Sequence, residues 1–155
     1  MKRLFLTLLT VFMIVALPLM ASAEKLQMVR VLESQTLAIA DFTDNTDATG
    51  YIDFDDALPA NAMVIGWKAV VSTAFAGDTT SVMQVGVSGD VNKYSANTAQ
   101  SCHTAGTLGS LALAVDAVTG MSTAKTPRVT VTEDSDFGDI TTGSMKVYIY
   151  YIDCR

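Results

Sequence analysis

Three groups of aspartates are the residues whose type and spacing could support chemistry. Asp41, Asp44 and Asp47 recur at every third position, and further groups lie at 53–56 and 134–139. Extracellular calcium sites take several oxygen ligands from loops of this kind, so these three residues are the candidate calcium ligands. None of the groups matches the calcium-loop motif, and aspartate is also a common turn former. Turn formation is the preferred interpretation, and calcium is the one cofactor that the sequence admits.

A catalytic set is not indicated by the remaining reactive residues. The only histidine, His103, follows Cys102 directly, and neighbouring residues on an extended chain point apart, whereas a thiol nucleophile and its base must face each other. The single tryptophan, Trp67, falls at a core position of an alternating strand rather than in a polar loop, which favours packing over a sugar platform. We therefore predict a protein that is not an enzyme.

The N-terminus has the three parts of a secretory signal peptide. Lys2 and Arg3 precede an apolar run over 4–16, and Ala21-Ser22-Ala23 supplies the small residues of a cleavage site. The sequence predicts a signal peptide over 1–23, one domain over 24–155, and export to the periplasm, cell surface or medium, with a virion as the other location. The alternative is an uncleaved anchor, which would be the chain's only link to a membrane.

The charge of the chain excludes some partners. The formal net charge is −6, and because 1–23 hold two of the ten basic residues and no acidic ones, cleavage would leave −8. Nucleic acids and anionic membranes are bound through clustered Lys and Arg, so neither is a predicted partner.

The two cysteines predict a disulfide. Cys102 and Cys154 both lie in the exported part, and an even cysteine count in an oxidising compartment indicates pairing. Two free thiols are the alternative.

Period-two alternation organises the domain. Short alternating runs separated by turn signals predict an all-β fold, an antiparallel β-sandwich of jelly-roll-like or immunoglobulin-like type. In the run over 63–75, Met63, Ile65 and Trp67 share one parity, and Gly66 suggests a bulge midway. Over 106–121 the composition admits a helical turn but favours a loop and a strand. The other expected strands cover 27–32, 36–42, 50–54, 82–87, the residues around 129–131, and 145–151.

The first and last strands carry the candidate assembly face. Tyr148 and Tyr150 lie on the second face of the last strand, opposite in parity to its apolar residues, and exposed tyrosines suit subunit interfaces. Leu26, Met28 and Arg30 belong to a strand-like N-terminal arm that would be free to complete the sheet edge of a neighbour.

Several strings resemble one group of viral proteins. They are FAGDT at 75–79, QVGVSGD at 84–90, YSANT at 94–98, TPRVTVT at 126–132 and VYIYYI at 147–152. Together they resemble small, all-β, head-associated or capsid-decorating structural proteins of tailed bacteriophages, for which a signal peptide is atypical. The resemblance covers about residues 47–152, and it implies a structural role without catalytic residues.

Two functions follow as hypotheses. The first is a non-enzymatic assembly subunit of a virion, an extracellular filament or a surface layer, with copies of itself or other structural subunits as partners. The alternative is a secreted binding or adhesion module that recognises carbohydrate or depends on calcium.

Overall fold

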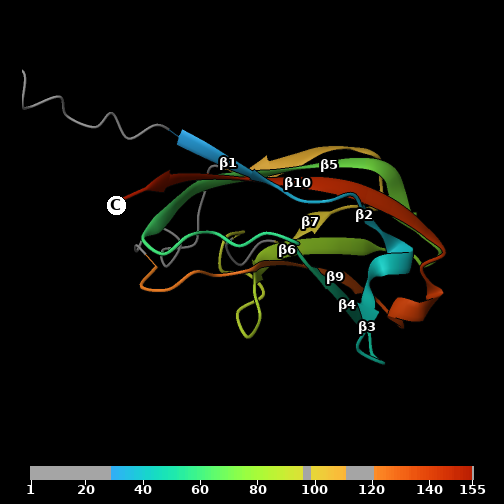
Figure 1. The fold of residues 1–155 in the computed structure, drawn as a ribbon. Helices are drawn as coiled ribbons and strands as arrows, with labels where there is room; N and C mark the ends of the chain where they lie inside the picture. The colour runs from blue at the N-terminus through green and yellow to red at the C-terminus, as the bar shows by residue number, and fades with distance from the viewer. Residues whose placement is uncertain (1–28, 96–98, 111–120, 155) are drawn as a thin grey trace, which may run out of the picture.

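A computed structural model of the chain describes residues 29–95, 99–110 and 121–154 (Figure 1). The predicted signal peptide and the arm residues Leu26 and Met28 lie outside these residues. Within them, no helix is both long and apolar enough to cross a membrane.

Ten strands and two 3-10 turns are present in the described residues. They are β1 (Val29–Glu33), β2 (Leu37–Ala38), η1 (Ile39–Asp41), β3 (Thr43–Asp44), β4 (Thr49–Asp53), β5 (Ala62–Ala76), β6 (Ser81–Val87), β7 (Gln100–Ser101), β8 (Gly106–Ser110), β9 (Pro127–Glu133), η3 (Phe137–Asp139) and β10 (Thr142–Asp153).

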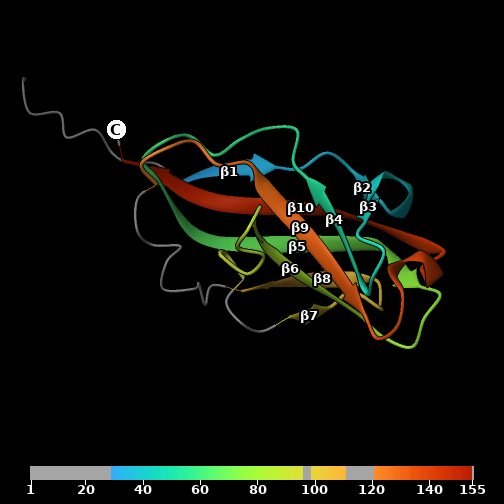
Figure 2. The same cartoon turned by 90° about the horizontal axis from the view of Figure 1, so that it is seen from below.

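The strands form two antiparallel sheets that pack face to face. The first sheet has the order β1-β10-β5-β8, with β2 also paired to β10, and the second has the order β3-β4-β9-β6-β7. Figure 1 shows the two layers from the side, and Figure 2 shows the strands of the second sheet crossing obliquely over those of the first. The predicted antiparallel β-sandwich is confirmed.

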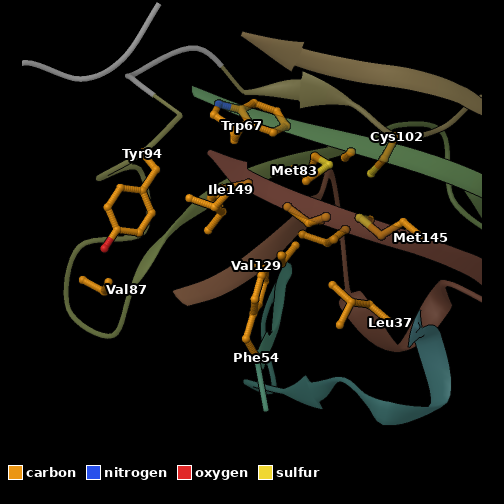
Figure 3. Packing of buried hydrophobic residues seen from close by; sticks show 14 of the residues in the cluster. Leu37, Phe54, Trp67, Met83, Val87, Tyr94, Cys102, Val129, Met145 and Ile149 are labelled. Atoms are coloured by element: carbon orange, nitrogen blue, oxygen red, sulfur yellow. The ribbon is translucent and has the colours of Figure 1, made fainter. Parts of the chain in front are cut away.

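The core lies between the sheets and follows the alternation in the sequence. Trp67 in β5 is buried, as predicted, and Figure 3 shows it pointing into the core together with Ile149 and Met145 of β10 and Met83 of β6. The apolar parity of β6, β9 and β10 is buried throughout, at Met83, Val85, Val87, Val129, Val131, Met145, Val147, Ile149 and Tyr151.

A bulge at Gly66 changes the parity of β5. Gly66 pairs with Tyr150, and the next pair along is Val64 with Tyr151, so that Ile65 is skipped. The predicted bulge is therefore present. Its consequence was not predicted: Ala62 and Val64 face the core, whereas Met63 and Ile65 are only half-buried, because an extra residue reverses the alternation.

The predicted strand over 36–42 is shorter than expected. Only Leu37 and Ala38 pair with β10, after which η1 turns the chain from the first sheet toward β3 in the second. Crossing between layers requires a break in the extended backbone. Over 106–121, β8 confirms a strand at 106–110, and residues 111–120 lie outside the described part.

An aromatic group fills the end of the sandwich where η3 lies. The Phe42 ring is 5.8 Å from both the Phe75 ring and the Phe137 ring, measured between centroids. The Phe137 ring lies directly over Gly50, where any Cβ atom would collide with it. The absence of a side chain at Gly50 is thus what lets η3 close onto β4.

Candidate assembly surface

Among the described residues, strand β1 forms an open edge of the first sheet. It pairs with β10 on one side and ends the strand order on the other. Val29 and Val31 on this edge are 53% and 51% exposed. An edge strand presents unpaired backbone N–H and C=O groups that a further strand can bind. The edges of the second sheet, β3 and β7, have two residues each and offer much less.

The charges on β1 are paired within the chain. Lys146 Nζ lies 2.6 Å from Glu33 Oε1, and an Arg30 guanidinium nitrogen lies 3.8 Å from an Asp153 carboxylate oxygen. Beyond β1, the Ser34 N–H donates to the Val147 carbonyl, and the Val147 N–H donates back to Ser34 Oγ. These contacts fix β1 along β10 and leave neither of its charged side chains without a counterion.

The outer face of the first sheet continues the apolar character of this edge. Val31 pairs with Tyr150, and Val29 pairs with Ile152, which in turn pairs with Met63. Directly paired residues lie on the same face of a sheet, and Met63, Tyr150 and Ile152 are half-buried there. We call Val29, Val31, Met63, Tyr150 and Ile152 the outer patch.

Tyr148 lies beside this patch, and its ring already contacts a lysine of the same sheet. Lys68 Nζ is 4.8 Å from the centroid of the Tyr148 ring, in the geometry of a cation–π contact. Both Tyr148 and Tyr150 are half-buried rather than fully exposed. They face away from the core, since Ile149 and Tyr151 on the other parity are buried.

The structure places Arg30 and Tyr150 of the predicted assembly face on opposite faces of the first sheet. Arg30 pairs with Tyr151 and so has the parity opposite to Tyr150, which pairs with Val31. Leu26 and Met28 lie outside the described residues. Sequence reasoning missed Val29 and Val31 because alternation gives the two faces of one strand but not its register against the next. The apolar residues flanking Arg30 were the available signal.

Two of the candidate calcium ligands, Asp44 and Asp47, act as turn residues, the interpretation preferred from the sequence. Asp44 Oδ1 accepts a hydrogen bond from the Thr46 N–H at 2.7 Å, and Asp47 Oδ1 accepts from both the N–H and the hydroxyl of Thr49 at 2.6 Å. The Thr49 hydroxyl, followed by its N–H, lowers the pKa of the Asp47 carboxyl. Asp41, Asp44 and Asp47 do not form a group. Among the described residues, the carboxylates that converge are Asp78, Glu133 and Asp134.

A serine, a cysteine and a histidine meet under the β5–β6 turn without forming a nucleophilic site. Ser81 Oγ is 3.4 Å from His103 Nδ1, but it donates its hydrogen to the Phe75 carbonyl at 2.6 Å, and Ser81 is 1% exposed. Burial is the main cause that raises the pKa of the Cys102 thiol to about 11. Neither group can present an activated oxygen or sulfur to a substrate, since nucleophilic cysteines need a lowered pKa and access.

The predicted disulfide between Cys102 and Cys154 is wrong. Both cysteines are free, Cys102 buried and Cys154 exposed. The Cys154 N–H bonds to Asn61 at the start of β5, whereas the Cys102 carbonyl accepts from Phe75 near its end. The two cysteines are separated by most of this 15-residue strand, a distance on the order of 40 Å. A disulfide needs Cα atoms within about 7 Å.

The two thiols should therefore differ in reactivity. In the native protein without reductant, we expect Cys154 to react promptly with a thiol reagent such as dithionitrobenzoate and Cys102 to react only on unfolding, because Cys102 is buried and protonated. Timed labelling followed by intact-mass measurement checks this. Cys154→Ser should remove the fast phase alone, and a chain with no titratable thiols after denaturation would contradict the assignment.

Comparison with solved structures finds the same fold in capsid chains of two phages. A chain of the capsid asymmetric unit of cyanophage Pam1 aligns with a TM-score of 0.55 and 19% identity, covering 80% of this chain and 84% of that chain. A chain of the capsid of Ralstonia phage GP4 aligns with a TM-score of 0.52 and 18% identity, covering 83% and 86%. No protein-family model and no curated protein sequence matches. At these identities the likeness shows a shared fold between chains of similar length.

Proposed function

We propose that the protein is a non-enzymatic structural subunit of a phage capsid that associates with copies of itself. The observation that carries the proposal is the fold shared, over four fifths of the chain or more, with chains of two phage capsids. The resemblance of the sequence to head-associated phage proteins points the same way, and it rests on turn and strand strings rather than on the fold.

The open edge supplies a means of association. Two copies of β1 placed antiparallel would extend the first sheet across a twofold axis, with Val29 and Val31 of both copies on one outer face. Because the chain carries a net charge of −6, such a contact must rest on backbone hydrogen bonds and apolar burial. Arg30 and Glu33 are each already paired within the chain, with Asp153 and Lys146, which is consistent with this.

Export and removal of residues 1–23 remain predictions, and they concern how the subunit reaches its site of assembly. An N-terminal sequence that begins at Glu24 in the protein recovered from its natural source would support cleavage after Ala23. A sequence that begins at Met1 would contradict it.

Two lysines on the open edge should abolish association. For Val29→Lys with Val31→Lys, we expect the association constant to fall at least about 100-fold, because juxtaposed like charges cost several kcal/mol. Sedimentation velocity over a concentration series measures the change. The valines are exposed, so circular dichroism and the unfolding midpoint should stay close to those of the unmodified protein.

Val91→Lys is the matched control. Val91 is another exposed valine, at 40%, and lies in the turn region after β6, away from the β1 edge. It should associate like the unmodified protein. The proposed edge is excluded if the double variant still assembles, or if Val91→Lys disrupts assembly equally.

A further inference from the structure

Two connections between the sheets run side by side at one end of the sandwich. The β5–β6 turn carries Asp78, and the segment that follows β9 leads through η3 to β10. The Thr141 N–H donates to the Ala76 carbonyl at 2.9 Å, and a Cβ at Gly77 would collide with the carbonyl oxygen of Asp139. The backbones are thus in direct contact, and side chains from both must share the space around them.

Three carboxylates from these connections converge. Oxygen atoms of Asp78, Glu133 and Asp134 all lie within 4.8 Å of one another. The pairing of Ser81 with Glu133 brings the end of β9 beside the turn before β6. We call these three residues the acidic corner.

Glu133 is the member that needs a partner. It is only 6% exposed, and its Oε1 atom is buried without a hydrogen bond. A buried carboxylate without hydrogen bonds or a counterion is strongly disfavoured. None of the ion pairs formed by the described residues includes any member of the acidic corner. The described side chains thus form no ion pair with this corner.

The electrostatics of the corner agree with this reading. Burial, followed by the charges of Asp78 and Asp134, raises the pKa of the Glu133 carboxyl to about 7. The pKa of Asp78 is lowered, chiefly by a hydrogen bond from the Ser135 hydroxyl. The corner thus places the carboxylates of Asp78 and Asp134 beside a carboxyl that is largely shielded from water.

We propose that the acidic corner binds a divalent cation of the hard, oxygen-preferring class, and that calcium is the ion that fits. Calcium–oxygen distances of about 2.3–2.6 Å allow ligands on one ion to lie up to ~5 Å apart, as the three carboxylates do. Magnesium demands tighter octahedral geometry and keeps more of its water. Water can complete the coordination on the exposed side at Asp134.

Neighbouring oxygens add to the donor set. Ser135 Oγ lies 2.5 Å from Asp78 Oδ2 and 3.3 Å from Asp139 Oδ2. A hydroxyl has one hydrogen and can satisfy only one of these carboxylates at a time. A bound cation would neutralise the group and tie the β5–β6 turn to the connection that precedes β10. The inference is independent of the proposed assembly.

Calcium should stabilise the chain. With chelated protein as the reference, about 10 mM calcium should raise the unfolding midpoint by roughly 3–10 °C, since extracellular calcium modules have dissociation constants of about 0.1–1 mM. Magnesium at the same concentration should give a smaller shift. Scanning calorimetry measures the midpoints, and titration calorimetry should give about one ion per chain.

Variants locate the site. Glu133→Gln and Asp134→Asn should each lose most of the calcium shift, and Glu133→Gln should unfold no earlier than the unmodified protein in chelator at pH 8, because it removes a buried charge. Asp44→Asn with Asp47→Asn, the matched control at two aspartates outside the acidic corner, should keep the full shift. No shift and no binding heat with either ion, or a full shift in Glu133→Gln, would overturn the proposal.

Discussion

Phe137→Ala should lower the free energy of unfolding by about 3–5 kcal/mol, the usual cost of removing a buried aromatic ring. The ring is 4% exposed, and it packs against Phe42 and over Gly50. The Phe137 N–H also donates to the Asp47 carbonyl at 2.9 Å, so this residue holds η3 against the second sheet. Denaturant unfolding followed by fluorescence and circular dichroism gives the value.

A double-mutant cycle with Gly50 tests the geometry directly. Gly50→Ala alone should cost about 1–3 kcal/mol because its Cβ collides with the Phe137 ring. In Phe137→Ala the ring is gone, so adding Gly50→Ala should cost little more, and the two effects should not add. Strict additivity would show that the ring does not lie over Gly50.

Tyr94→Ala should cost a similar amount, about 3–5 kcal/mol, whereas Tyr94→Phe should cost less than about 1 kcal/mol. The ring is fully buried at one end of the core (Figure 3), and within the described part of the chain its hydroxyl donates to Met121 Sδ at 3.3 Å. Thioether sulfur is a weak acceptor, so little is lost with the hydroxyl. Burial and then the charge of Asp90 raise the pKa of Tyr94, in keeping with this apolar setting.

The same unfolding experiment measures both Tyr94 variants. The segment around Tyr94 is also held by backbone, since the Tyr94 and Ser95 N–H groups both donate to the Val85 carbonyl. Tyr94→Ala should therefore leave a folded but less stable domain. A cost for Tyr94→Phe as large as that for Tyr94→Ala would mean that the hydroxyl, not the ring, is what stabilises the site.

Alternation was enough to predict the sandwich but not its details within a strand. In β10, every second residue from Met145 to Tyr151 faces the core, as the alternation in the sequence predicted. In β5 the same reading is right for Trp67 and wrong for Met63 and Ile65, because the bulge beside Gly66 intervenes. A glycine in a long strand signals that a bulge is present, but the exact residue at which the parity reverses depends on the partner strand.

Features that depend on which strands are neighbours lay beyond the sequence. The disulfide between Cys102 and Cys154 was predicted from an oxidising compartment and an even number of cysteines, but the two residues lie beside opposite ends of β5. The acidic corner is the opposite case, because its residues were not predicted to meet and yet lie close together. Asp78 is 55 residues before Glu133, and the two meet because β6 pairs with β9. Only the β6–β9 pairing, a long-range contact, determines that proximity.

The candidate assembly surface falls between these cases. The final strand and the N-terminal strand were identified from sequence, and the structure places them side by side as β10 and β1. Which residues of β1 share a face with Tyr150 depends on register, and the register selects Val31 rather than Arg30.

Sedimentation velocity on the purified chain, combined with electron microscopy of the same samples, tests the central claim most directly. The account predicts that the protein forms defined oligomers or ordered particles as concentration rises, and that these are lost in Val29→Lys with Val31→Lys. A single monomeric species up to about 1 mM, where even an association worth only ~4 kcal/mol populates dimers, would contradict it.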